Sequence, residues 1–354
     1  MTAAATARFS RSKRRLAWLL AAVLVLPQAQ AQDTLRLRND TVELQLAPQL
    51  GGRAVHLALH GRANVLKVGT AVREQPAPRL AADAGNIAYL GHEIWLGPQS
   101  AWWRDQDANP ARRDVQADWP PDPWLAFGRN RVLQHDPHDV QLQGPASPVS
   151  GVQVTQRYTL SAQRPGTVEV SVEARNVRGT PVARDIWFNT RVAPTTRVYV
   201  PAVPGDVRVR SDTDADYAEL RAVHSDGLFS LALDALPAGK QGRRGKVFIQ
   251  PGAGWMAGFA ADQLFVIRFE QQPRERIHPE HGQVELYLEW RADDASAGLL
   301  EMEVHAPYRH LAAGERMNAR EWWTLLAYNG PDERAAQVAF LRRHAVALGI
   351  EMPE

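Results

Sequence analysis

The chain has 354 residues, of which 41 are basic and 39 acidic, a formal net charge of +2, and no cysteine. The missing cysteines exclude disulfide bonds, zinc–thiolate centres and a cysteine nucleophile. A charge balance this close to neutral also argues against the basic surface of a nucleic-acid-binding protein.

The first 31 residues have the pattern of a secretory signal peptide. Five basic residues precede an unbroken apolar run over residues 16–26, and Ala29-Gln30-Ala31 forms a cleavage signature. This run is too short to span a bilayer. We therefore expect a signal peptide over 1–31, a mature domain over 32–354, a periplasmic or secreted location and no membrane attachment after cleavage. Removal of the five basic residues changes the expected net charge from +2 to −3.

Apolar side chains alternate with a period of two along most of the mature chain, which is typical of half-buried strands. Turn residues separate these segments, as in a sandwich or barrel. After the first alternating residues, 35–37 and 42–46, strands are predicted at 54–59, 152–160, 167–175, 183–192, 207–210, 228–233, 246–250, 255–260, 264–270, 283–290, 299–305 and 321–326.

Only the C-terminal region has helical spacing. Val338, Leu341, Ala345 and Leu348 recur on one face of a helix predicted over 332–348. No change of composition divides the mature chain, so we predict one large antiparallel all-β domain with a C-terminal helix.

Residues 91–124 are rich in tryptophan. The second half of this segment has no apolar periodicity, and Pro120, Pro121 and Pro123 argue against a helix or a central strand there. Two interpretations stay open: the indole rings stack on a sugar, or they close one end of the core. The segment holds five of the eleven tryptophans, at positions 95, 102, 103, 119 and 124.

Three segments together resemble the galactose mutarotase-like (aldose 1-epimerase) superfamily. VELQLAPQLGGRAVHLALHGRANVLK (42–67) resembles its opening strand, Gly-Gly-Arg turn and second strand. YLGHEIWLGPQ (89–99) stands in the place of its glycine-led active-site segment. LLEMEVHAPYRHLAAGERMNAREWWTLL (299–326) resembles its late acidic strand, turn and final strand. The resemblance implies a large antiparallel β-supersandwich and membership of an exported bacterial branch of the superfamily.

Mutarotation needs a base for the anomeric hydroxyl and an acid for the ring oxygen. In the enzymes that the chain resembles, a glutamate on the late strand is the base and a histidine on a middle strand is the acid. The late strand here offers Glu301 and Glu303, which leave the same face because they are two residues apart. One of them could be the base while the other raises its pKa by like-charge repulsion.

The middle strand ARDIWFNTRVAP (183–194) contains no histidine. By position, His92 and His305 could replace it, and His92 is favoured because it lies in the segment expected to face the site. We therefore predict Glu301, Glu303 and His92 as catalytic residues. The predicted substrate-binding residues are Arg53, Trp95, Trp102, Trp103, Trp187, Asn189 and His305.

No metal or other cofactor is predicted. The histidine-containing segments 135–139 and 278–281 match no known ligand spacing, and we interpret both as surface loops. Glu285 and Glu289 are interpreted as an exposed strand face.

We predict that the chain is an exported protein that recognises a mono- or oligosaccharide and acts on it by acid–base chemistry, as an aldose epimerase does. The missing middle-strand histidine keeps an alternative open, which is a non-catalytic glycan-binding or structural envelope module.

Overall fold

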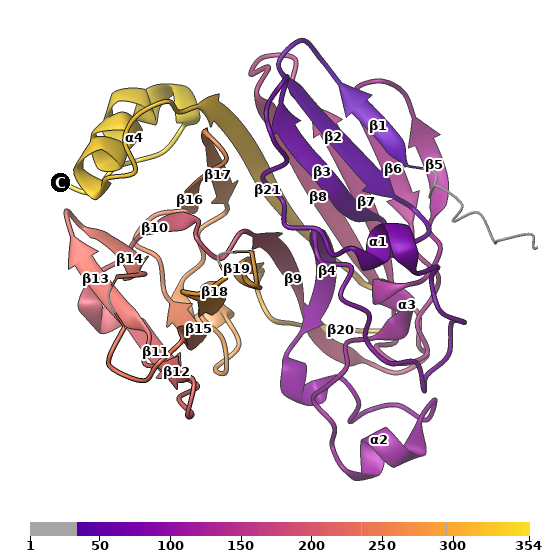
Figure 1. Cartoon of the computed structure of the whole chain (residues 1–354). Helices are drawn as coiled ribbons and strands as arrows, with labels where there is room; N and C mark the ends of the chain where they lie inside the picture. Colours follow the sequence, from indigo (N-terminus) through magenta and orange to yellow (C-terminus); the bar gives the residue numbers. More distant parts are fainter. Residues whose placement is uncertain (1–33, 235, 295) are drawn as a thin grey trace, which may run out of the picture. The chain divides into compact units, whose positions relative to one another are not determined.

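The computed structural model describes residues 34–234, 236–294 and 296–354. The predicted signal peptide and its cleavage site lie outside the described residues. Within them the chain forms two large β-sheets and one substantial helix near the C-terminus, which confirms the predicted all-β sandwich (Figure 1). No helix in the described part is both long and apolar enough to cross a lipid bilayer.

The first sheet carries the candidate site, and its described strands are antiparallel except for the parallel pair β12–β15. Its hydrogen-bonded order is β1 (Leu35–Arg38), β2 (Val42–Ala47), β3 (Arg53–Leu59), β4 (His92–Gly97), β9 (Val182–Val192), β19 (Gly298–His305), β18 (Val284–Arg291), β15 (Gly242–Ile249) and β11 (Val207–Ser211), with β12 (Tyr217–Ala218) beside β15 and β20 (Arg309–Leu311) beside β9.

The second sheet packs its inner face against the first. Ile186 and Phe188 of β9 share one buried cluster with Trp323 of the second sheet. Each apolar side chain of this kind stabilises the fold by roughly 1.5–3 kcal/mol when it is buried. The order of the sheet is β13 (Arg221–Ser225), β14 (Leu228–Ala232), β10 (Arg197–Pro201), β16 (Trp255–Ala260), β17 (Gln263–Phe269), β21 (Arg316–Ala327), β8 (Thr167–Asn176), β7 (Val152–Leu160), β6 (Asp139–Gln143) and β5 (Arg131–His135).

Strand β9 is buried on both faces, unlike the alternating strands β7 and β8. Its apolar residues Ile186 and Phe188 enter the core between the sheets. The alternate residues Asp185, Asn189 and Arg191 leave the opposite face, yet all three are less than 5% exposed. Buried polar side chains need partners, so a second, polar layer covers this face of the sheet.

Four α-helices occur in the described residues. Three are short: α1 (Ala71–Glu74), α2 (Pro110–Asp114) and α3 (Pro123–Ala126). The fourth, α4 (Arg334–Leu348), confirms the predicted C-terminal helix and ends at Gly349, whose φ of 65° is the left-handed conformation typical of a helix C-cap. Short 3₁₀ helices form at Gln99–Ala101, Pro204–Asp206 and Arg274–Arg276.

The interpretation of the tryptophan-rich segment was partly wrong. Prolines do not exclude helices in its second half, because α2 and α3 each begin with a proline, where the missing N–H has no intrahelical partner. The side chains of Asn109 and Asp122 cap these helices by accepting the N–H groups of Arg112 and Trp124. The first half of the segment forms β4, a central strand of the first sheet.

Candidate functional site

The strand register places charged and polar side chains in two adjacent rows on the outer face of the first sheet. In one row Glu93, Asn189, Glu303 and Glu285 are successive neighbours on β4, β9, β19 and β18. The next row contains Arg191, Glu301, Tyr287 and Lys246 on β9, β19, β18 and β15. Both rows leave the same face because they are two residues apart along each strand.

Two carboxylates lie directly opposite each other in this arrangement. Like charges at opposed positions destabilise a sheet, and Glu285 and Glu303 are both buried. Lys246 offsets their repulsion, because its Nζ lies 2.7 Å from Glu285 Oε2 and 2.8 Å from Glu303 Oε2. These three residues are called the lysine–carboxylate cluster below. Lys246 is its most exposed member, with 12% of its side chain accessible.

The two glutamates differ in their hydrogen-bond donors. Among the described residues, Glu285 accepts hydrogen bonds from His281 and from the Gly282 N–H, whereas Glu303 accepts one from Asn189. Each of the two carboxylates also forms an ion pair with Lys246. Burial raises the pKa of Glu303 to about 8, against the effect of Lys246 and with a further increase from the other carboxylates. Burial also opposes the charge of Glu285, but Lys246 and His305 outweigh it and hold the pKa of Glu285 well below its usual range. Glu303 therefore keeps a proton at neutral pH beside an ionised Glu285.

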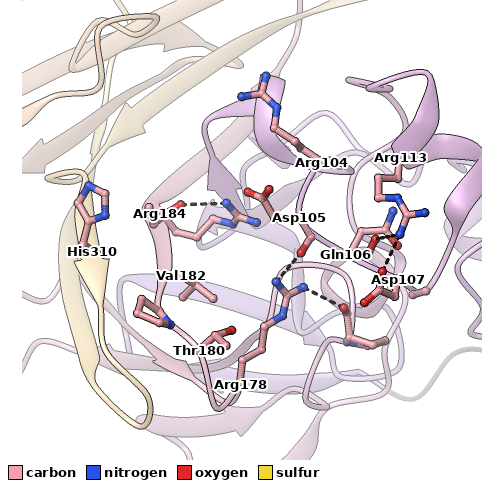
Figure 2. Close-up of a pocket in the computed structure, with 14 residues that line it drawn as sticks. Arg104, Asp105, Gln106, Asp107, Arg113, Arg178, Thr180, Val182, Arg184 and His310 are labelled. Atoms are coloured by element: carbon pink, nitrogen blue, oxygen red, sulfur yellow. Dashed lines mark hydrogen bonds and ion pairs between the residues drawn. The ribbon is translucent and has the colours of Figure 1, made fainter.

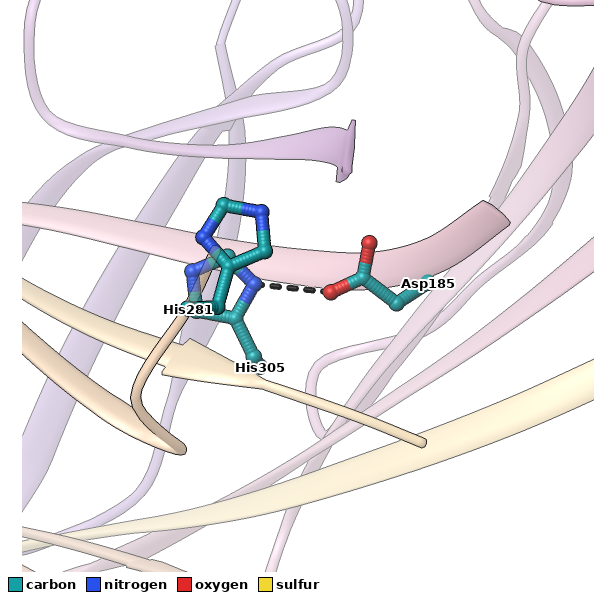
Figure 3. Close-up of side chains that lie close together, drawn as sticks. All are labelled: Asp185, His281 and His305. Atoms are coloured by element: carbon teal, nitrogen blue, oxygen red, sulfur yellow. Dashed lines mark hydrogen bonds and ion pairs between the residues drawn. The ribbon is translucent and has the colours of Figure 1, made fainter. Parts of the chain in front are cut away.

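His281 and His305 stack on each other (Figure 3). Both rings also lie beside Glu285. Nδ1 of His305 donates to Asp185 Oδ2 at 2.7 Å, and its Nε2 lies 3.7 Å from Glu285 Oε1. Burial opposes the charge of His305, but Glu285 and Asp185 outweigh it and raise its pKa to about 9. Burial and the neighbouring His305 instead lower the pKa of His281. The pair therefore holds one imidazolium and one neutral ring, and the Nε2 atom of His281 has no hydrogen-bond partner among the described residues.

These side chains bring ligand-type atoms close enough to suggest a metal site. One group is Asp185, His281 and His305, and another is Glu285, Glu303 and His305. The lone pair of an imidazole nitrogen lies in the ring plane, and the two histidine planes are only 19° apart with centroids 4.0 Å apart. The lone pairs of two rings that are stacked with nearly parallel planes do not point at one ion. The Lys246 ammonium already stands between the two glutamates, so the arrangement fits a proton network better than a metal centre.

A chain of buried ion pairs continues the polar layer toward β3. Arg53 binds one oxygen of Glu93, Arg191 binds the other, and Arg191 Nε reaches Glu301 Oε1 at 2.8 Å. Burial opposes the charge of Glu93, but the two guanidinium groups lower its pKa to about 2. The side chain of Glu301 is 12% exposed, so this arginine–glutamate chain ends in a carboxyl group that solvent reaches.

Indole rings cover the site near the histidines. Trp187 lies 4.6 Å from His305 and 4.9 Å from Trp95 between ring centroids, and Trp95 contacts Trp102 at 5.3 Å. All three rings are less than 7% exposed, whereas Trp119 next to Trp102 is 49% exposed. A ligand could therefore stack on Trp119 more readily than on the buried rings.

The sequence of residues 32–326 matches the model of a protein family described as Domain of unknown function (DUF4380). The chain belongs to this family. A comparison with curated proteins finds no significant match.

Solved structures with the same fold share little sequence with this DUF4380 chain. A Klebsiella pneumoniae protein described as a candidate aldose 1-epimerase is 12% identical, with a TM-score of 0.52 over 87% of this chain and 82% of that one. The Slr1438 protein of Synechocystis is also 12% identical, with a TM-score of 0.50 over 85% of this chain and 99% of that one. A galactose mutarotase-like protein of Lactobacillus casei is 10% identical, with a TM-score of 0.47 over 83% of this chain and 100% of that one. The DUF4380 chain thus shares the fold of the aldose 1-epimerase-like protein of Klebsiella pneumoniae, as its sequence motifs predicted.

Most of the predicted site residues lie in the polar layer or the tryptophans beside it. His92 does not. It lies on the core face of β4, where its Nδ1 is 2.8 Å from Thr190 Oγ1 and its ring contacts Trp323. Burial and the nearby Arg191 lower the pKa of His92 to about 3, so we leave it out of the proposed site. The predicted residues that do lie there are Arg53, Trp95, Trp102, Trp187, Asn189, Glu301, Glu303 and His305.

Two surface assignments were wrong. The segment 278–281 is a loop with exposed residues at 279 and 280, but His281 at its end is not at the surface, because it is 6% exposed and stacks on His305. Glu285 is not part of an exposed strand face, because the lysine–carboxylate cluster buries it completely. The alternating pattern of β9 could have identified Asp185 and Arg191, since both are polar residues in phase with Asn189. No sequence signal identified Lys246 or Glu93.

Trp103 is a core residue in this fold. It is fully buried, and its Nε1 donates to the Pro120 carbonyl at 2.7 Å. We expect Trp103→Phe to lower the free energy of unfolding by about 1–3 kcal/mol, because the carbonyl loses its buried donor. Trp119→Phe is the matched control and should cost less than about 0.5 kcal/mol, since that ring is half exposed. Urea unfolding measures both, and equal losses would contradict the assignment of Trp103 to the core.

Stability should fall as pH rises from 7 to 9. Burial raises the pKa of Glu321 to about 8, as it does for Glu303, and His305 has a pKa of about 9. Each of these groups has a higher pKa in the folded chain than in the unfolded chain. Between the two pKa values, the folded chain therefore holds a proton that the unfolded chain has released. Their stabilising effect is lost as pH passes 8 and then 9. A group with one extra bound proton contributes a slope of about 1.4 kcal/mol per pH unit.

Thermal unfolding between pH 7 and 9 tests this expectation. The Glu321→Gln variant should show a shallower fall, because its amide does not titrate. A wild-type melting temperature that rises with pH over this window would contradict the assigned pKa directions.

Proposed function

We propose that this chain is an exported carbohydrate-recognising protein that acts on a sugar by acid–base chemistry at the lysine–carboxylate cluster. The observation that carries the proposal is the pair of opposed glutamates with pKa values pushed apart. In this pair Glu303 holds a proton while Glu285 is ionised, so the cluster presents a general acid at neutral pH beside the solvent-accessible Glu301. Burying this many charges costs stability, and perturbed groups of this kind gather at functional sites.

The roles follow from protonation and exposure. Glu303 holds the proton and is the proposed acid, while the solvent-accessible Glu301 is the proposed base. Glu303 is fully buried, so proton transfer to a sugar requires Lys246 to move aside. Burial raises the pKa of Tyr287 to about 12, so its hydroxyl stays neutral and can donate to a sugar hydroxyl. Trp119 offers the half-exposed ring on which the apolar face of a sugar could stack.

The missing middle-strand histidine has neighbours that could compensate in part. Trp187 occupies that segment, and its ring lies 4.6 Å from His305 and 5.4 Å from His281 between centroids. Imidazole groups are thus close to this position but come from other segments. We expect weak or no mutarotation of glucose, galactose and xylose, because a positioned general acid contributes a hundredfold or more.

Proton NMR in D₂O with a panel of neutral and acidic mono- and oligosaccharides tests the proposal. Anomer exchange or deuterium incorporation that is lost in Glu303→Gln and Glu301→Gln would support acid–base catalysis. Glu289→Gln, which changes a carboxylate of the same sheet outside the cluster, should keep the activity. Absence of both sugar turnover and sugar binding across the panel would contradict the proposal.

A second candidate function is non-catalytic glycan binding. The complete burial of Glu285 and Glu303 favours it, because reacting groups must reach the substrate. Calorimetric titration separates the two: saccharide binding without exchange in the wild type, weakened in Trp119→Ala, would support the binding module.

A further inference from the structure

A pocket of about 660 Å³ lies where β9 begins, lined by the turn before this strand, the segment that follows the 3₁₀ helix at Gln99–Ala101, and β20 (Figure 2). Its volume is in the range of small-molecule sites. The charged side chains of its wall are Arg104, Arg113, Arg178, Arg184, Asp105 and Asp107.

Arg184 is the buried charge of this wall. It is only 3% exposed, and its one hydrogen bond to a described residue runs from Nη1 to the Ala183 carbonyl at 2.9 Å. Among the described residues, no carboxylate oxygen lies within 4.0 Å of the Arg184 guanidinium nitrogens, the limit for an ion pair. Burial and then the nearby Arg178 lower its pKa, and the carboxylates of Asp105 and Asp122, which lie beyond ion-pair distance, raise it in part. A buried guanidinium without a counter-ion is costly, so buried charges are normally paired.

Two other arginines of the pocket, Arg178 and Arg113, already have partners. Arg178 donates to the backbone carbonyls of Asp105, Pro148 and Val149. Arg113 pairs with Asp107. Arg184 is therefore the buried cation whose remaining N–H donors are available to a ligand in the pocket.

We propose that this pocket binds an oxyanion, a carboxylate or a sulfate, carried by a molecule of mono- to disaccharide size. The planar guanidinium of Arg184 would hold the oxyanion through paired N–H donors, and the ligand would supply the counter-ion that the fold does not. The inference is independent of the proposed acid–base function, because Arg184 leaves the opposite face of β9 from Asp185 and the histidine pair.

Calorimetric titration and thermal unfolding test the site in the wild type, Arg184→Met and Arg197→Met. The probes are glucuronate, digalacturonate, sodium sulfate and glucose, at ionic strength matched with sodium chloride. At least one anion should bind the wild type and raise its melting temperature, and Arg184→Met should weaken that binding at least tenfold. Arg197, which pairs with Asp332, is the matched control and should leave binding unchanged.

Each pattern of results decides the proposal. Binding of glucuronate alone identifies a carboxylate ligand, and binding of sulfate alone identifies a sulfate ester. No anion binding, equal binding by Arg184→Met, or an equal effect of neutral glucose would overturn it. If Arg184→Met does not fold, Arg184→Lys keeps the charge but loses the planar fork. It should then show weakened anion binding with an unchanged fold, and unchanged binding would overturn the proposal.

Discussion

Replacement of Lys246 by methionine is expected to lower the free energy of unfolding by about 3–5 kcal/mol at pH 8, the cost of removing one partner from a buried ion pair. The ammonium is the group that contacts both Glu285 and Glu303. Methionine keeps roughly the length of the lysine side chain but leaves the two opposed carboxyl groups without the ammonium that contacts both. The loss should be smaller at pH 5, because Glu303, with a pKa of about 8, is then fully protonated and no longer repels Glu285.

Chemical denaturation at pH 5 and pH 8 measures this effect. Lys240→Met is the control, because Lys240 contacts the backbone carbonyl of Asp214 at the surface and should cost less than about 0.5 kcal/mol. The double variant Lys246→Met/Glu303→Gln should recover part of the lost stability, since the amide carries no charge. A loss that does not depend on pH would show that Lys246 acts through packing alone.

A second large effect is expected for Glu93→Gln. Arg53 and Arg191 have side chains only 2% and 4% exposed, and both bind this carboxylate. The amide leaves two buried guanidinium groups without their shared counter-ion, which should cost at least about 3–5 kcal/mol. The pKa of Glu93 is about 2, so its stabilising effect is present above the unfolded value and disappears as pH falls from about 4.5 toward 2.

Glu43→Gln is the matched control for Glu93→Gln. Glu43 pairs with Arg36, whose side chain is 51% exposed, and surface pairs contribute about 0–1 kcal/mol. If Glu93→Gln is too unstable to purify, Arg53→Met/Glu93→Gln removes one of the unpaired charges and should be easier to fold. Equal stability of the two single variants would contradict the assignment of Glu93 to a buried chain.

Period-two alternation was sufficient to predict most strands and the sandwich, because one face of each strand enters the core. It could not give the register between strands. Glu285 and Glu303 are 18 positions apart and become neighbours only through the pairing of β18 with β19. The burial of Glu285 depends on that pairing and on Lys246, which comes from a third strand.

The position of His92 follows from a strand that the sequence analysis did not identify. Had residues 92–97 been read as a strand, Glu93 and Trp95 would share one face and His92 would leave the other. The roles of the individual tryptophans could not be predicted either, since tryptophans occur both in cores and at sugar sites. The exposed fraction separates Trp103 from Trp119, and burial is not visible in a single sequence.

The most direct test of the account is the titration of the Glu303 side chain. Carbon-13 NMR of the labelled glutamate carboxyl carbons, assigned with Glu303→Gln and Glu285→Gln, follows each ionisation. Glu303 is expected to titrate with a midpoint near pH 8, with Glu285 already ionised far below neutral pH. Ionisation of Glu303 below pH 5, as for an exposed glutamate, would contradict its proposed role as the acid.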